Sequence, residues 1–203
     1  MKILALEMSS ARGSLAWVDS ALEVERNWPN DRKNSGLFFT NLKAVTEEYG
    51  LPDTIMVGLG PGSYAGGRIA ISAAIGLQTA AKARLIGYPS ICAIDGGPGE
   101  YWVVGDARRQ TFFCARVREH TLLDEIALLT EKELHDQLSR LDATVPIFAG
   151  ESLLLFERVT VRYPEARILA RIAGEKDRQF SLPPLEPIYL REPHITMPRT
   201  SVR

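Results

Sequence analysis

One glycine-rich segment of the sequence has the residue types that hold phosphate groups in other proteins. Gly60–Ser63 reads Gly-Pro-Gly-Ser and lies between a short apolar run and a long stretch of helical spacing. Glycine lets a backbone approach a ligand closely, and a helix N-terminus offers unpaired N–H groups to an anion. The same residues also suit a tight turn in which Ser63 caps the helix and Pro61 restricts the backbone. Both interpretations stay open, with Gly60, Gly62 and Ser63 as candidate nucleotide- or phosphate-binding residues.

Two further polar segments have the same pair of interpretations. Ser9 and Ser10 follow the first apolar run at a turn, where their hydroxyl groups are candidate phosphate ligands. Serine at such a place also bonds to the neighbouring backbone. Asp106–Arg109 reads Asp-Ala-Arg-Arg, which is either an acid beside two anion-binding cations or the turn of a solvated hairpin. Turn-forming propensities favour the hairpin turn.

Several catalytic patterns are missing from the sequence. The segment Gly60–Ala65 matches the dinucleotide pattern G-x-G-x-x-[GA], but it follows the fourth predicted strand, and the next strand ends without the acid that binds ribose. The three histidines form no pair at helical spacing, and neither a phosphate-loop lysine nor a Gly-x-Ser-x-Gly turn is present. We therefore expect no metal site and no catalytic residue in this chain.

Composition and charge narrow the class of protein. The 203 residues are 45% hydrophobic and 24% charged, which is typical of a globular protein. Subtracting acidic from basic residues gives 24 − 25 = −1, so the chain is not expected to bind nucleic acid strongly on its own. Two cysteines are too few for a disulfide scaffold, and no apolar run suits a signal peptide or a membrane span. These features predict a cytoplasmic protein with no membrane insertion.

The first half of the chain predicts a mixed sheet covered by helices, which is an α/β arrangement. The expected strands are Lys2–Met8, Ser14–Asp19, Leu22–Trp28, Thr54–Leu59 and Arg84–Tyr88, and the expected helices are Leu37–Tyr49 and Tyr64–Ala83. The second helix is rich in glycine and alanine. Because a glycine inside a helix costs roughly 1 kcal/mol relative to alanine, this helix should pack closely on the sheet or on a helix of another chain.

The second half shows a similar strand-rich order without a detectable sequence repeat. A boundary at Gly96–Gly99 divides the chain into domains 1–98 and 99–203. The expected elements are a hairpin of Tyr101–Asp106 and Thr111–Val117, a strand near Ile126–Leu129, helix Glu131–Arg140, strand Val145–Ala149 and a helix after Gly150. The proline-rich tail from Leu182 onward is expected to lie extended over the surface.

Four segments of the sequence together resemble the TsaB family, which supplies a subunit for threonylcarbamoyladenosine synthesis on tRNA. They are spread over almost the whole chain and comprise Leu4–Ser10, Gly58–Ile69, Asp106–Arg108 and Pro187–Arg191. The second segment is the most specific of the four. Glu7 stands where the family usually has aspartate, and Tyr64–Gly67 replaces the usual Phe-Thr-Gly-Leu.

The resemblance implies two ribonuclease-H-like domains of the actin/sugar-kinase/Hsp70 superfamily, the second of them reduced. It also implies a catalytic paralogue, TsaD, which holds the metal and the active site, and a TsaE-like ATPase as a third subunit. In the family, helices of the first domain pack against the matching helices of TsaD or of a second TsaB. The candidate interface residues implied here are Leu37, Phe38, Asn41, Leu42, Val45, Tyr64, Gly67, Arg68, Ile71, Ala74 and Ile75.

Two functional hypotheses follow from these features. The first is a non-catalytic scaffold that activates TsaD, reaches tRNA only through the complex and has no cofactor of its own, with ATP or ADP bound only within the complex. A homodimer is the alternative assembly. The second is an autonomous nucleotide-binding ATPase or phosphotransferase of the same superfamily, which would use Ser9, Ser10 and the Gly60–Ser63 loop. A glycoprotease-like activity has less support because the sequence offers neither a nucleophile nor a metal-binding set.

Overall fold

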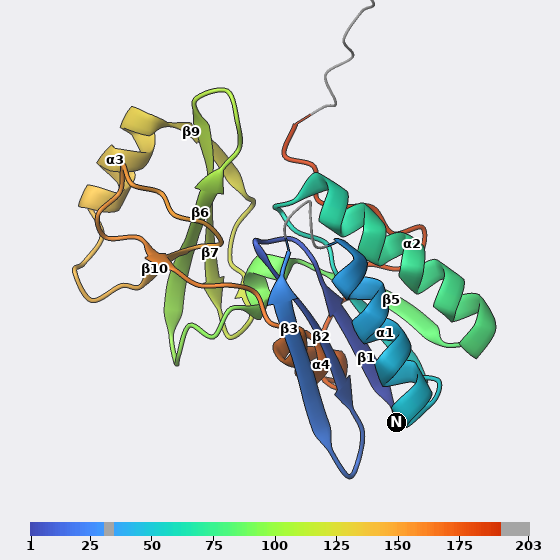
Figure 1. The fold of residues 1–203 in the computed structure, drawn as a ribbon. Helices are drawn as coiled ribbons and strands as arrows, with labels where there is room; N and C mark the ends of the chain where they lie inside the picture. Colours follow the sequence, from blue (N-terminus) through green and yellow to red (C-terminus); the bar gives the residue numbers. More distant parts are fainter. Residues whose placement is uncertain (31–34, 192–203) are drawn as a thin grey trace, which may run out of the picture.

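The computed structural model describes residues 1–30 and 35–191 of the chain (Figure 1). Within them the chain forms two sheets with helices packed around them. Residues 192–203 of the proline-rich tail lie outside the described part. No helix of the described residues is long and apolar enough to cross a membrane.

The first half of the chain builds a five-stranded mixed sheet in the order β3-β2-β1-β4-β5. β1, β2 and β3 are antiparallel neighbours, whereas β4 and β5 run parallel to β1. Every residue of β1 and β4 is buried because both faces of these central strands are covered. The strands are β1 (Ile3–Glu7), β2 (Arg12–Val18), β3 (Glu23–Pro29), β4 (Thr54–Gly58) and β5 (Arg84–Tyr88).

Helices α1 (Ser35–Tyr49) and α2 (Tyr64–Ala81) cover one face of this sheet (Figure 1). Their inward side chains pack on the strands in one apolar cluster, and the small residues of α2 on that side let the helix lie close to the sheet. The buried helix residues of this cluster are Phe38, Val45, Ala70, Ile71 and Ala74.

The second half builds a six-stranded sheet in the order β11-β10-β6-β7-β8, with β9 also paired to β7. β6 and β7 form the expected antiparallel hairpin, and β10 and β11 run parallel to β6. The sheet therefore repeats the strand arrangement of the first, and the expected α/β fold of two mixed sheets covered by helices is confirmed. Its elements are β6 (Glu100–Asp106), β7 (Thr111–Arg118), β8 (Thr121–Leu122), β9 (Ala127–Thr130), α3 (Glu131–Ser139), β10 (Ile147–Ala149) and β11 (Thr160–Val161).

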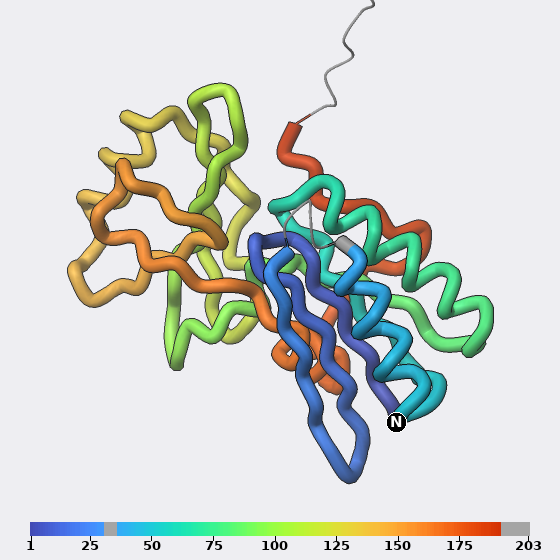
Figure 2. The backbone as a smooth tube through the Cα atoms, in the orientation of Figure 1, coloured from blue at the N-terminus to red at the C-terminus, as the bar shows by residue number. Residues whose placement is uncertain are grey.

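Helix α4 (Ala166–Ala173) belongs to the second half of the sequence but packs on the first sheet, on the face opposite α1 and α2 (Figure 2). Its apolar cluster includes Met56 of β4 and continues through the 3-10 helix η1 (Ser90–Ala93) to Val103 of β6. One apolar core therefore joins the two sheets. The division into domains 1–98 and 99–203 stays a prediction.

The expected helix after Gly150 is α4, and it begins only at Ala166. Directly after Gly150 the chain forms a loop and then the short strand β11. Arg158 holds this loop by donating hydrogen bonds to the carbonyls of Leu138 at 3.0 Å, Leu141 at 3.1 Å and Asp142 at 2.7 Å. These bonds satisfy carbonyls at the C-terminal end of α3, where a cation also interacts favourably with the helix dipole.

The described part of the proline-rich tail is also more than a surface covering. Ser181 pairs with Gly87 of β5 through two backbone hydrogen bonds of 2.9 and 3.0 Å. Leu185 is buried in the cluster beneath α1 and α2. The tail therefore adds to the core and then continues along α2.

The shared core predicts that the two sheets unfold together. Leu169 of α4 is fully buried in this core, so Leu169→Ala should lower the free energy of unfolding by about 2–5 kcal/mol through the cavity it leaves. Urea denaturation followed by tryptophan fluorescence and far-UV circular dichroism should still give coincident transitions. Leu154→Ala is the matched control, because Leu154 is 92% exposed and its loss should change stability by less than about 0.5 kcal/mol. Separate transitions for the two probes would contradict the shared core.

Candidate functional site

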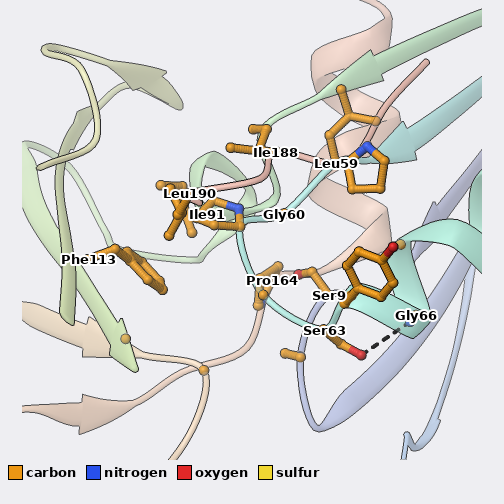
Figure 3. A pocket seen from close by; sticks show the side chains of 18 of the residues that line it. Ser9, Leu59, Gly60, Ser63, Gly66, Ile91, Phe113, Pro164, Ile188 and Leu190 are labelled. Carbon is orange, nitrogen blue, oxygen red and sulfur yellow. Dashed lines mark hydrogen bonds between the residues drawn. The ribbon is translucent and has the colours of Figure 1, made fainter. Parts of the chain in front are cut away.

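A cleft of about 820 Å³ opens between the two sheets and brings together segments that lie far apart in the sequence. Residues from all four segments singled out in the sequence line it, and Figure 3 labels members of three of these segments. They come from the turn after β1, the start of α2, the β6–β7 hairpin and the end of the tail: Ser9–Ser10, Gly60–Gly67, Asp106–Arg108 and Pro187–Arg191. The candidate phosphate-binding residues therefore do meet in space.

One wall of the cleft is apolar. Leu59, Ile91, Phe113, Ile188 and Leu190 contribute the side chains of this wall (Figure 3). These residues come from the loop after β4, from η1, from β7 and from the tail. Such a wall suits a ring or another apolar group, and only a few polar groups face it.

The glycines of the Gly60–Ser63 loop allow two backbone segments of the protein to touch. The amide of Ser63 donates to the carbonyl of Ser9 at 2.6 Å. A Cβ atom on Gly62 would lie 2.1 Å from that same carbonyl oxygen, and one on Gly66 would lie 2.0 Å from the carbonyl oxygen of Met8. The close approach that the sequence predicts is therefore made to the turn after β1.

Ser63 caps α2, as the turn interpretation predicts. Its Oγ accepts a hydrogen bond from the amide of Gly66 at 3.2 Å (Figure 3). Among the described residues, no group accepts a hydrogen bond from the amides of Tyr64 and Ala65, and both residues line the cleft. These two amides are the polar groups at the start of α2 that remain for an anion.

The turn after β1 uses its own polar groups internally. Ser10 Oγ donates to the carbonyl of Arg12 at 2.9 Å and accepts from the amide of Arg12 at 3.3 Å. Asn30 Nδ2 donates to the carbonyls of Met8 at 3.0 Å and Ser10 at 2.8 Å. Asn30 also lines the cleft, and the sequence analysis missed it because its partner carbonyls are about twenty residues away.

The Asp106–Arg109 segment is the hairpin turn that turn propensities favour. Asp106 Oδ1 accepts from the amide of Arg108 at 2.6 Å, and its Oδ2 accepts from Arg108 Nη1 at 2.9 Å. The backbone of Arg108, Arg109 and Gln110 is left-handed, with φ of 66°, 54° and 59°. Asp106 and Arg108 border the cleft but are paired with each other.

Glu7 lies beneath the cleft, fully buried at the end of β1. Its Oε1 accepts a hydrogen bond from the amide of Ser9 at 2.6 Å, whereas its Oε2 has no hydrogen-bond partner among the described residues. Oε2 occupies the space that a side chain at Gly58 would fill, because a Cβ atom there would lie only 1.9 Å away. Burial raises the pKa of Glu7 above its ordinary value, against the lowering effect of the hydrogen bond from the Ser9 amide.

The donor groups do not fit a metal-bound nucleotide of the kind that the superfamily resemblance implies. The Glu7 carboxyl group is not among the groups that line the cleft, and the Ser10 hydroxyl is already bonded to the backbone. No group of three or more metal-ligating side chains occurs in the described part of the chain. The remaining donors at the start of α2 fit an anion without a metal.

The structure divides the candidate interface residues into two sets. Phe38, Val45, Gly67, Ile71 and Ala74 are buried within the chain, because they face the sheet or the tail. Their side chains are therefore not available to a partner in this conformation. The other candidates lie at the surface or half-buried, and they are Leu37, Asn41, Leu42, Tyr64, Arg68 and Ile75.

A groove of about 390 Å³ lies where the outer sides of α1 and α2 meet. Phe39, Arg68, Ile69, Ser72 and Ala73 line it. Phe39 and Ser72 are not among the interface residues that the resemblance implies. Leu37–Phe39 are three consecutive apolar residues near the start of α1. Their spacing therefore does not distinguish the exposed ring of Phe39 from the buried ring of Phe38.

Two solved structures from Pseudomonas aeruginosa are similar to this chain. One, described as an uncharacterized protein with similarity to the peptidase YeaZ, has a TM-score of 0.69 and 20% identity, and the match covers 94% of this chain and 99% of the other. The second, YeaZ, has a TM-score of 0.63 and 19% identity over 85% of this chain and 90% of its own. At these identities the likeness establishes the fold. No family model and no curated protein matches the sequence.

The buried carboxyl group predicts a specific dependence of stability on pH. Because the pKa of Glu7 is raised in the folded chain, its stabilising contribution is complete below its unfolded pKa and is lost as pH rises through the folded pKa. Glu7→Gln removes the titration, so the variant should gain stability relative to the wild type over the pH range above the ordinary pKa of a glutamate carboxyl group. Urea midpoints across this range measure the difference. A difference that stays constant with pH would show that the pKa of Glu7 is the same in both states.

Proposed function

We propose that this chain is a non-catalytic, TsaB-like subunit of a threonylcarbamoyladenosine-synthesis complex and that it dimerises with a TsaD-like paralogue through α1 and α2. The observation that carries the proposal is the exposed apolar surface where these two helices meet. In this role the chain stabilises the active form of its catalytic partner. A TsaE-like ATPase and tRNA are reached through the complex, and ATP or ADP belongs to the complex as a whole.

The outer side of the two helices has the composition of a partner-binding surface. Phe39 of α1 and Ile75 of α2 are 54% and 48% exposed, and Leu37 of α1 is also exposed. Arg68 and Ser72 precede Ile75 at helical spacing, so they share the outer stripe of α2. Large apolar side chains gathered around a groove on an otherwise polar surface mark interaction sites. Helix pairs of this kind pack against a second helix pair through interlocking side chains.

The cleft supports a scaffold more than an enzyme. In the turn after β1, the Ser9 amide, the Ser10 hydroxyl and the Ser10 carbonyl are bonded within the protein. Glu7, the one fully buried acid among the described residues, is not among the residues that line the cleft. A catalytic acid or base must lie within hydrogen-bond reach of the proton that it transfers. Glu7 is buried away from the cleft, and Asp106 is paired with Arg108.

Charged substitutions on the outer side of the helices should abolish the heterodimer without unfolding the chain. Phe39→Asp or Ile75→Asp places an uncompensated carboxylate in the apolar contact, so affinity for the TsaD-like protein of the same organism should fall by at least about 30-fold. Size-exclusion chromatography with light scattering measures complex formation.

Leu154→Asp is the matched control for these variants. Leu154 is an exposed leucine on the second sheet's side, away from α1 and α2. Its replacement should leave the complex intact. Ala74 is unsuitable for such a test, because a larger residue there would overpack the chain's own core. If Phe39→Asp and Ile75→Asp bind the TsaD-like protein as the wild type does, the helices are not the interface.

A second function is favoured by one observation, the pair of free amides at the start of α2. The cleft volume and its apolar wall suit a nucleotide, with its phosphate at the amides of Tyr64 and Ala65. An autonomous ATPase or phosphotransferase would then bind nucleotide without a partner. Calorimetry of the isolated chain with ATP and magnesium separates the two functions. A scaffold should give no heat of binding, whereas a micromolar site would favour the enzyme.

A further inference from the structure

Three surface residues form a tyrosine–arginine cluster at the N-terminal end of α2. Arg68 Nη1 donates a hydrogen bond of 2.7 Å to the hydroxyl of Tyr64, and its guanidinium carbon lies 5.1 Å from the centre of the Tyr64 ring. The ring of Tyr189 packs beside Tyr64, with 5.4 Å between the ring centres. Both tyrosines remain about half exposed, at 53% and 45%.

Tyr189 comes from residues 185–191 of the tail, here termed the strap. Leu185 anchors one end of the strap in the core beneath the helices. The amide of Ile188 donates to the carbonyl of Leu59 at 2.7 Å, and Pro187 lies 3.6 Å from the position of a Cβ atom on Gly67. Arg191 donates to the hydroxyl of Thr111 on the second sheet. These contacts hold Tyr189 in a fixed place beside α2.

Arg68 connects the cluster with the groove between α1 and α2. It lines that groove together with Phe39 and Ser72. Among the described residues, no carboxylate forms an ion pair with Arg68, although twelve such contacts occur elsewhere in that part of the chain. An exposed arginine stacked on an exposed tyrosine adds little to the stability of its own chain. Tyrosine and arginine are, however, the residue types that dominate binding energy at protein interfaces.

We propose that the partner-binding surface continues from the two helices onto the strap, with Tyr64, Arg68 and Tyr189 at its energetic centre. The partner segment that fits this surface offers apolar side chains to the groove and a carboxylate to Arg68. The inference rests on the proposed function and adds the chemistry that the TsaD-like partner must present. It also gives the strap a role. Because the strap is already held in place, binding at Tyr189 loses little conformational entropy.

Affinity for the TsaD-like protein of the same organism tests the inference. Tyr189→Ala should raise the dissociation constant about tenfold, because it removes a preorganised aromatic contact outside the helices. Arg68→Glu should raise the dissociation constant at least about 100-fold, because the new carboxylate would then face the partner's carboxylate in a desolvated contact. Calorimetry or biolayer interferometry measures the constants, and the affinity of the wild type should fall with added salt, whereas that of Arg68→Glu should not.

Leu182→Ala serves as the control, because Leu182 is an exposed residue of the same tail that precedes the strap. It should bind as the wild type does, and all variants should keep the wild-type melting temperature. Wild-type affinity for Tyr189→Ala and Arg68→Glu, together with loss of binding for Phe39→Asp, would overturn the inference and leave the proposed function standing. Wild-type affinity for Phe39→Asp as well, or no binding by the wild type, would overturn both.

Discussion

The backbone contact between the Gly60–Ser63 loop and the turn after β1 positions both functional surfaces of this chain. The 2.6 Å hydrogen bond from Ser63 to Ser9 is possible because Gly62 and Gly66 carry no side chain to separate the two segments. The contact determines where α2 begins, and Ser63 then caps the helix. The first turn of α2 borders the cleft, and its outer side forms the groove with Phe39. A side chain at Gly62 or Gly66 would therefore displace both surfaces together.

Helix α4 belongs to the second constraint, an apolar core that includes residues of both sheets. Its residues fill one apolar core with Met56 of the first sheet and Val103 of the second. The cleft is lined from both sheets, so its width depends on this packing. Close-packed cores of this kind transmit displacements and do not deform freely. Arg191 adds a second connection by joining the strap to Thr111 on β7.

The polar groups around the cleft and the apolar groups on the helices together favour binding over catalysis. Glu7, Ser10 and Asp106 are each used to hold the fold, and Glu7 occupies the space left by Gly58 beneath the floor. By contrast, the apolar side chains of Phe39 and Ile75 are exposed, and no contact within the described part of the chain explains their exposure. Exposed apolar area of this kind is costly for a protein that acts alone. These features support the proposal of a scaffold subunit that works with a paralogous partner.

Local patterns in the sequence were sufficient for the order of strands and helices in the first half and for the hairpin at Asp106–Arg109, because each depends on residues that are close in the chain. They offered the cap at Ser63 as one of two interpretations. Tertiary structure alone decided which side of α1 is outward. Leu37, Phe38 and Phe39 are all apolar, and only the packing of the helix on the sheet determines which of them is buried. It also decided that the glycines serve a contact with Ser9, and that α4 and the tail pack on the first sheet. Such long-range contacts leave no periodic signal, because they depend on how distant segments meet in space.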